Sequence, residues 1–315
     1  MGPHDLPFDN YAQAMTSEES VALVALLRDR PGGQTWTELT ASVLEYGSAR
    51  ALRDELRAEE LLEDPAFAAT TEEARRDIEA WIRSGLQFVT ITDDRYPARL
   101  REIHQAPPFL FARGAFHEGE PAISVVGSRK ASDEGLRIAA SVSQLLVRRQ
   151  ISVVSGLAAG IDAAAHEAAL DAGGRPVGVI GTGINKTYPK TSGELHRRVA
   201  EAGLLLSQFW PDAPPQKHTF LMRNATMSGY GIATVVVEAG ELSGARAQAR
   251  MAVEHGRPVI LTDLVVGKTQ WAKALIGRPG VSVASSLAEI EKEIDALLSI
   301  PDHVSSALRS LRTVA

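Results

Sequence analysis

Four short segments of the chain combine glycine with polar or charged side chains, and each follows an apolar run. They are Gly127-Ser128-Arg129-Lys130, the stretch from Ser155-Gly156 to Gly160, Gly181-Thr182-Gly183, and Ser243-Gly244 at an expected helix start. Glycine lets a backbone approach a ligand closely, and free N–H groups at a helix start attract anions, most often phosphate. We therefore predict a phosphate or polyphosphate site. The alternative is that these glycines only form turns.

Basic and amide side chains extend this predicted site. Arg223 and Asn224 lie in a segment that we expect to be a polar turn, and Lys217 precedes them. With Arg129 and Lys130, they are expected to hold phosphates. The alternatives are solvent-exposed charges for Arg129 and Lys130 and a structural salt bridge for Arg223.

Three aromatic side chains near the same loops are candidates for stacking on nucleic-acid bases. They are Phe220, Tyr188 and Trp210. Single-strand binders use aromatic rings in this way because every base has a flat face. Packing beneath the loops is the alternative for each ring.

Carboxylates near the loops raise the question of catalysis. Glu238 and Glu241 flank the last glycine loop, and in an enzyme they would act on a bound ribose. In a binding protein they would orient arginines or loop amides. Asp162 is expected to cap its helix, and we expect a structural hydrogen bond between Asp162 and His166 rather than a metal site. We predict no catalytic residue, no metal and no cofactor.

Several common chemistries are excluded by what the sequence lacks. Neither the first loop nor Gly181-Thr182-Gly183 continues to the third glycine of a dinucleotide-binding motif, and no G-x-x-x-x-G-K-[ST] motif is present. The chain has 0 cysteines, which excludes disulfides, zinc–thiolate sites, iron–sulfur clusters and thiol catalysis.

The elements that position these residues follow from hydrophobic periodicity. Apolar runs predict strands at 123–126, 151–154, 177–180, 204–206, 234–237, 259–261 and 281–284. Helical patterns lie between them, at about 134–149, 162–172, 192–202, 243–256 and 268–276. This alternation predicts an α/β fold with a mostly parallel sheet covered by helices on both faces. The four loops would then meet at the carboxyl ends of the strands, where such sheets bind ligands.

The N-terminal part has a different character. Helical patterns over 17–84 predict a small helical domain at 1–84, followed by the α/β domain at 85–300 and a short tail at 301–315. Residues 88–91 form a short β run, and we expect 109–111 to be irregular. Residues 1–80 hold 7 Lys/Arg and 17 Asp/Glu, a net charge of −10, whereas residues 81–315 hold 26 and 22, a net of +4. This asymmetry fits an anionic ligand on the larger part.

Overall composition sets further limits. The net charge of the whole chain, 33 − 39 = −6, excludes a globally basic nucleic-acid coat. The apolar runs are far shorter than the roughly 20 residues of a membrane span, and the first ten residues do not resemble a signal peptide. We expect a cytoplasmic protein that does not contact a membrane.

Five motifs in order resemble the DprA/Smf (DNA-processing protein A) family. They are the segments 124–130, 154–162 with His166, 181–185 with Tyr188-Pro189, 220–224 and 237–244. The resemblance also covers 92–97 and Pro107-Pro108, and it spans about 88–262. It implies an extended Rossmann-like domain related to the lysine-decarboxylase-like (LOG) nucleotide enzymes. Members bind single-stranded DNA, dimerise, help to load the RecA recombinase during transformation, and have no established catalytic chemistry.

The resemblance can be carried over residue by residue. The positions that match the family's ligand loops are Gly127, Ser128, Arg129, Gly156, Gly160, Asp162, Arg223, Asn224, Ser243 and Gly244. The chain departs from the family pattern at Ala225, where the family has a second arginine, and at 262–268, where the family has a proline-glycine continuation. The winged-helix domain of many members is not seen.

Two functions follow from these observations. The leading hypothesis is a non-enzymatic single-stranded DNA binder of the DprA type, which acts as a homodimer and assists RecA-dependent recombination or DNA uptake. The alternative is a sensor for a small nucleotide, or an enzyme resembling nucleotide N-glycosidases, that uses the same glycine-rich edge.

Overall fold

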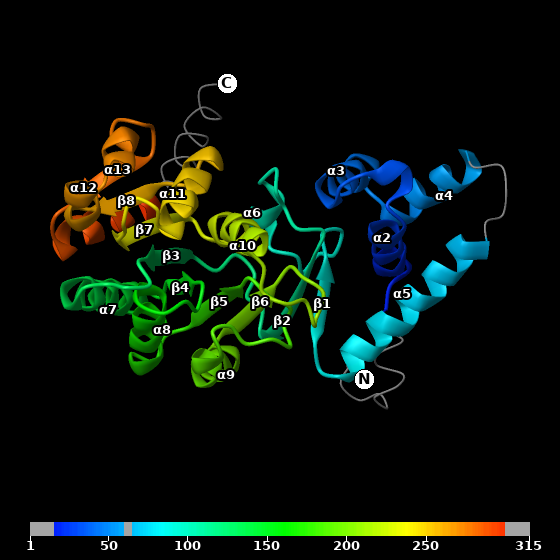
Figure 1. Cartoon of the computed structure of the whole chain (residues 1–315), viewed down its shortest axis with the longest axis horizontal. Helices are drawn as coiled ribbons and strands as arrows, with labels where there is room; N and C mark the ends of the chain where they lie inside the picture. The colour runs from blue at the N-terminus through cyan, green and yellow to red at the C-terminus, as the bar shows by residue number, and fades with distance from the viewer. Residues whose placement is uncertain (1–15, 60–64, 300–315) are drawn as a thin grey trace, which may run out of the picture.

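The structure is a computed structural model, and it describes residues 16–59 and 65–299 (Figure 1). The N-terminal helices are α2 (Glu18–Asp29), α3 (Trp36–Tyr46), α4 (Ala49–Glu59) and α5 (Pro65–Arg83), with a short 3-10 turn at Pro31–Gly33. Ser17 caps α2 by accepting a hydrogen bond from the amide of Ser20 at 3.1 Å. The predicted tail at 301–315 lies outside the described residues.

A nine-stranded sheet forms the centre of the molecule. Its strands are β1 (Gln87–Thr90), β2 (Phe109–Gly114), β3 (Ala122–Gly127), β4 (Ser152–Ser155), β5 (Pro176–Ile180), β6 (Leu204–Ser207), β7 (Ala233–Glu238), β8 (Val259–Thr262) and β9 (Val281–Ala284). Their order is β1-β2-β6-β5-β4-β3-β7-β8-β9. β2 pairs antiparallel with both β1 and β6, and all other neighbours are parallel. The predicted mostly parallel sheet is therefore confirmed.

Helices cover both faces of this sheet (Figure 1). One face carries α7 (Asp133–Arg148), α8 (Ile161–Asp171) and α9 (Gly193–Ala202), and the other carries α10 (Lys217–Tyr230), α11 (Gly244–Glu254), α12 (Asp263–Lys268) and α13 (Gln270–Leu275). The buried strand residues are mostly valine, isoleucine and leucine on both faces. A sheet of this kind is typical of doubly wound Rossmann-like folds.

Two local predictions are wrong. Residues 109–111 form part of strand β2, because their apolar side chains pair with both β1 and β6. Arg223 and Asn224 lie in the middle of helix α10 rather than in a polar turn.

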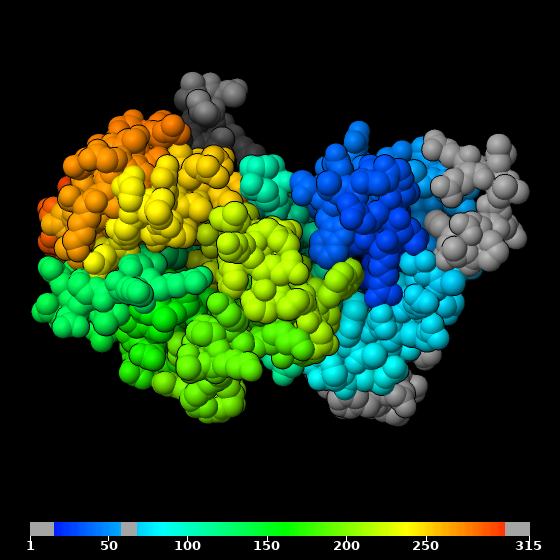
Figure 2. All heavy atoms as spheres, viewed as in Figure 1, coloured from blue at the N-terminus to red at the C-terminus, as the bar shows by residue number. Residues whose placement is uncertain are grey.

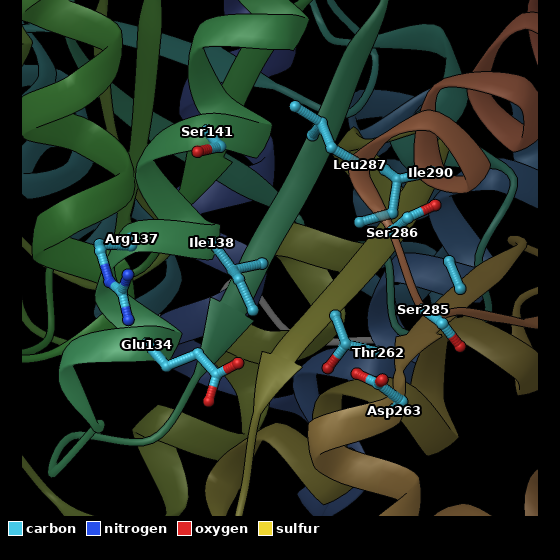
Figure 3. A pocket seen from close by; sticks show the side chains of 11 residues that line it. Glu134, Arg137, Ile138, Ser141, Thr262, Asp263, Ser285, Ser286, Leu287 and Ile290 are labelled. Atoms are coloured by element: carbon cyan, nitrogen blue, oxygen red, sulfur yellow. The ribbon is translucent and has the colours of Figure 1, made fainter.

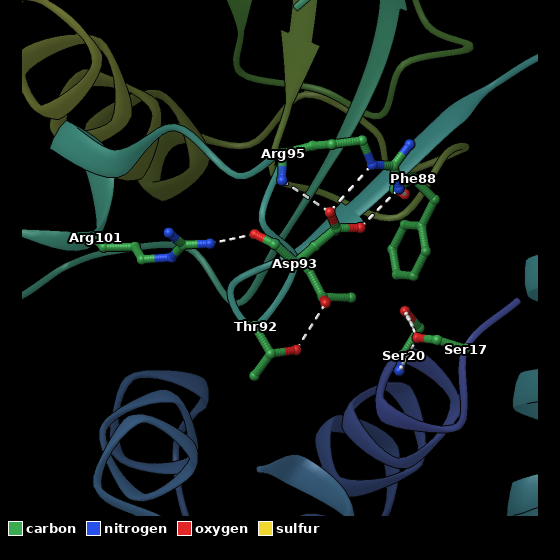
Figure 4. Close-up of polar contacts among 8 residues, drawn as sticks. Ser17, Ser20, Phe88, Thr92, Asp93, Arg95 and Arg101 are labelled. Carbon is green, nitrogen blue, oxygen red and sulfur yellow. Dashed lines mark hydrogen bonds and ion pairs between the residues drawn. The ribbon is translucent and has the colours of Figure 1, made fainter. Parts of the chain in front are cut away.

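The lead-in segment between β1 and the short helix α6 (Ala98–Arg101) has a structural role (Figure 4). The carboxylate of Asp93 accepts hydrogen bonds from the backbone amide of Arg95 at 2.9 Å and from its guanidinium at 2.7 Å. Arg101 donates to the backbone carbonyls of Ile91 and Asp93, and the hydroxyl of Tyr96 donates to the carbonyl of Pro107 at 2.7 Å. These contacts fix the turn that leads into β2.

The N-terminal helices pack on the β1–β2 edge of the sheet through aromatic side chains. Trp210 stacks on Phe109 with ring centroids 4.5 Å apart, and Trp36 meets Trp210 edge-on at 5.3 Å. Trp81 meets Phe111 edge-on at 4.9 Å. Since the rings come from α3, α5, β2 and the segment after β6, this aromatic cluster joins the helical part to the sheet.

Candidate nucleic-acid site at the switch point of the sheet

The chain changes direction across the sheet between β3 and β7. These strands are parallel neighbours, and the chain continues from β3 to β4 on one side but from β7 to β8 on the other. Such a switch point opens a crevice beyond the carboxyl ends of the two strands. A pocket of about 620 Å³ lies here, lined by residues from the loops after β3 and β7, from α10 and from the start of α11. We call it the basic pocket.

Positive charge gathers at its mouth. Arg129, Lys130 and Lys217 all line the basic pocket, and all three are exposed. The guanidinium of Arg129 lies over the ring of Phe220, 5.6 Å from its centroid, so the cation and the ring form one surface. The structure thus brings together four of the side chains that the sequence proposes for phosphates and bases.

Arg223 forms part of the floor. Its guanidinium is buried and donates a hydrogen bond to the backbone carbonyl of Val179 at 2.8 Å. Burial lowers the pKa of Arg223 and the charge of Arg129 lowers it further, whereas the carboxylate of Asp162 opposes the shift. The side chain still lines the pocket, but its guanidinium is buried and is not exposed at the mouth.

Two of the glycines are required by packing between loops. A Cβ at Gly156 would lie 1.7 Å from Nη1 of Arg223, so only glycine leaves room for this guanidinium. Gly160 has φ +80°, and a Cβ there would lie 2.2 Å from the carbonyl oxygen of Ser128. The glycines of the loop after β4 thus let it lie against the side chain of Arg223 from α10 and against the loop after β3.

Five of the predicted phosphate residues do not line the basic pocket. They are Ser155, Gly156, Gly160, Gly181 and Gly183. The hydroxyl of Ser155 donates to the carbonyl of Val125 at 2.7 Å, and the amide of Gly183 donates to the carbonyl of Ala213 at 2.9 Å. Their polar groups are committed to the fold because neighbouring loops cover the carboxyl ends of β4 and β5.

The start of α11 forms another wall. Ser243 caps this helix, since its hydroxyl accepts a hydrogen bond from the amide of Ala245 at 3.2 Å. The side-chain amide of Asn224 donates to the carbonyl of Gly244 at 3.4 Å and links α10 to α11. Ser243, Gly244 and Asn224 all line the basic pocket, as the sequence predicts for one common site.

The two glutamates have structural partners. Glu238 accepts hydrogen bonds from the amide and hydroxyl of Ser132 at 2.8 and 2.9 Å and from Nζ of Lys268 at 3.0 Å. Burial opposes ionisation of Glu238, but these hydrogen bonds outweigh it and hold its pKa below the usual value. Glu241 accepts a hydrogen bond from the amide of Gln270 at 3.0 Å. Lys268, at the end of the segment that departs from the family pattern, and Gln270 just after it thus anchor the loop that follows β7.

Asp162 and His166 do not form the predicted pair. The carboxylate of Asp162 accepts a hydrogen bond from the loop amide of Gly156 at 3.1 Å rather than capping α8. His166 is fully buried, burial lowers its pKa to about 4, and neither ring nitrogen has a hydrogen-bond partner among the described residues. His166 is therefore a neutral core residue.

The candidate stacking residues occupy two different environments. Tyr188 lies on the surface, 42% exposed, with its ring 5.4 Å from that of Phe220. Trp210 instead belongs to the aromatic cluster, and Arg28 lies over its ring at 5.6 Å. Trp210 is not part of the basic pocket.

The sequence analysis missed several residues that line the basic pocket. Leu221 and Met227 come from α10, Gln248 from α11, and Leu242 from the loop before it. Leu242 is 96% exposed, so an apolar side chain stands at the mouth beside the basic ones. Helical spacing along α10, once that helix is recognised, would have found Leu221 and Met227.

A second hollow, of about 290 Å³, lies between α7 and the end of β8 (Figure 3). Glu134 and Arg137 line it from α7, and Asp263 lines it from the start of α12. Its charges have mixed sign, and it contains none of the predicted site residues. The basic pocket is therefore the better candidate for an anionic ligand.

Two other features are absent from residues 16–59 and 65–299, a metal-binding cluster and a membrane-spanning helix. No group of three or more histidines and carboxylates could hold a metal ion there. In the same part of the chain, no helix has both the length and the apolar character needed to cross a membrane.

The fold is that of a Rossmann-like protein, and its candidate ligand site lies at the topological switch point. Residues 87–293 match the family described as DNA recombination-mediator protein A, and the chain belongs to this family.

Several known proteins are similar to this chain. It is 39% identical over 178 residues to Protein Smf of Synechocystis, which covers 55% of this chain and 45% of that protein. It is 40% identical over 171 residues to DNA processing protein DprA of Streptococcus pneumoniae, which covers 54% and 60%. The matches thus span about half of the relatives' length.

Two solved structures share the fold. The X-ray structure of DprA from Streptococcus pneumoniae has a TM-score of 0.65 and 31% identity, and it covers 82% of this chain and 92% of that one. A structure that concerns the single-stranded DNA binding mode of DNA processing protein A from Helicobacter pylori has a TM-score of 0.58. At 19% identity over 66% of this chain and 95% of that one, it supports the fold alone.

Proposed function

We propose that this protein binds single-stranded DNA in the basic pocket, without catalysis, and acts in DNA recombination. The observation that carries the proposal is the surface formed by Arg129, Lys130 and Lys217 around the ring of Phe220. Cations hold the phosphates of a single strand, and an aromatic ring supplies a platform for a base. The description of the family and the names of the relatives support the same function.

The site residues carry different roles in this proposal. Arg129, Lys130 and Lys217 hold phosphates at the mouth, and Phe220 with the neighbouring Tyr188 stacks on bases. Ser128, Asn224 and the α11 start at Ser243-Gly244 supply polar groups along the walls. Arg223 supports the floor. Assembly as a homodimer and delivery of the strand to a RecA recombinase are proposed on the family resemblance.

Salt dependence tests the phosphate role. We expect a variant with Arg129→Ala, Lys130→Ala and Lys217→Ala to lose at least about tenfold in affinity for a single-stranded oligonucleotide. The slope of log affinity against log salt should fall in magnitude by about 2, since each phosphate contact on a single strand contributes roughly 0.7. Fluorescence anisotropy over a series of salt concentrations measures both quantities.

A matched control has the same change of charge elsewhere. Lys273, Arg278 and Lys292 are exposed, lie outside the basic pocket, and are replaced together by alanine. This control variant should keep both the affinity and the salt slope within error. If both triple variants behave alike, the positive charge acts non-specifically and the basic pocket is not the site.

A nucleotide-cleaving enzyme is the competing function, and the contacts of its two candidate carboxylates argue against it. Glu238 is held by Ser132 and Lys268, and Glu241 by the amide of Gln270. We expect the purified protein to release no free base from AMP, dAMP or their pyrimidine counterparts, as measured by chromatography. Base release that disappears in Glu238→Gln or Glu241→Gln would establish the enzyme instead.

A further inference from the structure

A smaller pocket of about 190 Å³ lies on the opposite side of helix α10 from the basic pocket. It is lined by α3, by α10 and by the segment that precedes β2. Figure 2 shows the surface of the first helices (blue) directly beside that of α10 (yellow-green). We call this hollow the neutral pocket.

Helix α10 is the wall between the two pockets. Phe220 and Met227 line the basic pocket, Met222 and Ala225 line the neutral pocket, and Leu221 lines both. Residues three or four positions apart share one side of a helix, which explains how consecutive residues serve different pockets. A ligand that reaches past Leu221, which is 49% exposed, would touch both pockets.

The chemistry of the neutral pocket differs from that of its neighbour. None of the described residues that line it carries a charge. Apolar and aromatic side chains, among them Trp36, Met222 and Met251, form most of its wall. A lining that is mainly apolar, with few polar groups, is typical of small-molecule sites and suits a flat ring.

Two carboxamides provide the polar groups. The side-chain oxygen of Gln208 accepts a hydrogen bond from the hydroxyl of Thr226, and that of Gln105 bonds Nε2 of His255. Neither amide nitrogen has a hydrogen-bond partner within the part of the chain that the structure describes. Each can therefore donate a hydrogen bond to a ligand. Ring nitrogens and carbonyl oxygens at the edges of nucleobases are such acceptors.

We propose that the neutral pocket binds one nucleobase of the strand whose phosphates lie in the basic pocket, an inference that rests on the function proposed above. The volume of about 190 Å³ is below the roughly 300–1,000 Å³ of sites for drug-sized ligands, so one ring system fits and a larger group does not. The absence of charge among the lining residues excludes the phosphate itself from this side of α10.

Ala225 is the residue that leaves this space open. It lines the neutral pocket and is only 2% exposed. The family resemblance places an arginine at this position, and a side chain of that length would fill the volume and bring a charge into it. Alanine at position 225 therefore removes a positive charge and leaves space for a base.

The test compares two strands of equal length, one with normal bases and one entirely abasic, by anisotropy at one salt concentration. Ala225→Met fills the neutral pocket from within, and Thr37→Met fills it from its exposed edge on α3. Ala41→Met is the matched control, one turn further along α3, exposed and outside the pocket. Thermal unfolding of each variant identifies any that fails to fold.

We expect both pocket-filling variants to bind the normal strand about tenfold more weakly and the abasic strand as the wild type does, because one base contact is lost. Ala41→Met should change neither affinity. Equal losses on both strands, or no loss in the folded Thr37→Met protein, would overturn the proposal. A wild-type protein that binds neither strand would instead refute the proposed function.

Discussion

Replacing Arg223 with methionine should lower the free energy of unfolding by about 3 kcal/mol, the low end of the range for removing one member of a buried charge pair. Asp162 and Arg223 are both buried, and the carboxylate opposes the lowering of the pKa of Arg223. No direct ion pair joins them among the described contacts, which is why we take the low end. Without the guanidinium, the buried carboxylate of Asp162 loses its nearby positive charge and keeps loop donors, among them the amide of Gly156 at 3.1 Å.

The loss of unfolding free energy in Arg223→Met should depend on pH. Burial raises the pKa of Asp162, and Arg223 acts in the opposite direction, so the pKa should rise further in the variant. A carboxyl group with a raised pKa in the folded state takes up a proton on folding, and the folded state therefore gains stability as the pH falls through that value. The gain is complete below the unfolded pKa of about 3.9. The difference between Arg223→Met and the wild type should thus shrink from pH 8 to pH 5.

Urea denaturation of a double-mutant cycle measures the coupling. Asp162→Asn keeps a hydrogen-bond acceptor but leaves Arg223 buried without its counter-charge. The double variant has neither charge, so its loss should be smaller than the sum of the single losses by about 1–3 kcal/mol. Strict additivity, together with a deficit that does not change with pH, would show that the two charges do not interact.

The arrangement of the basic pocket was largely predictable from the sequence. Short apolar runs separated by helical patterns require a parallel sheet, and parallel strands bring their carboxyl ends to one edge. Arg129 after β3 and Ser243 after β7 therefore had to lie close together once β3 and β7 became neighbours. The structure places residues of both loops in the pocket, together with residues of helix α10.

The sequence did not show which glycine loops are open to a ligand and which are covered by other parts of the chain. Gly156 and Gly183 have the same local pattern as Gly127, but other parts of the chain cover them. The side chain of Arg223 passes over Gly156, and the amide of Gly183 is bonded to Ala213. Local sequence shows that glycine is needed at such positions, and it does not show whether a ligand or another loop makes the close approach.

Helix α10 was missed because polar residues occupy several of its buried positions. The buried residues Arg223, Asn224, Thr226 and Ser228 interrupt the apolar period that would indicate a helix. They are buried because their side chains bond carbonyls and other side chains, as Asn224 bonds Gly244 and Thr226 bonds Gln208. Such partners come from distant segments, so hydrophobic periodicity alone could not identify this helix.

Trp210→Ala should lower the free energy of unfolding by about 3 kcal/mol, the low end of the range for removing a core tryptophan, because this ring is only partly buried. The loss should leave single-stranded DNA binding intact, contrary to the stacking role that the sequence suggested. Trp210 contacts Phe109 of β2, Trp36 of α3 and Trp81 of α5, and Arg28 of α2 lies over its ring. Its removal therefore weakens the attachment of the N-terminal helices to the sheet.

Hydrogen exchange locates this effect, and anisotropy tests the DNA role. Exchange should accelerate in α2, α3 and α5 of the Trp210→Ala protein, whereas α7 and α8 on the sheet should remain as protected as in the wild type. Trp81→Ala is the companion variant, since Trp81 belongs to the same cluster and was never a candidate for base stacking. Both folded variants should bind a single strand within about twofold of the wild type, roughly 0.4 kcal/mol. Both variants weaken the same aromatic cluster. If Trp210→Ala loses DNA affinity and Trp81→Ala does not, Trp210 belongs to the DNA-binding surface after all.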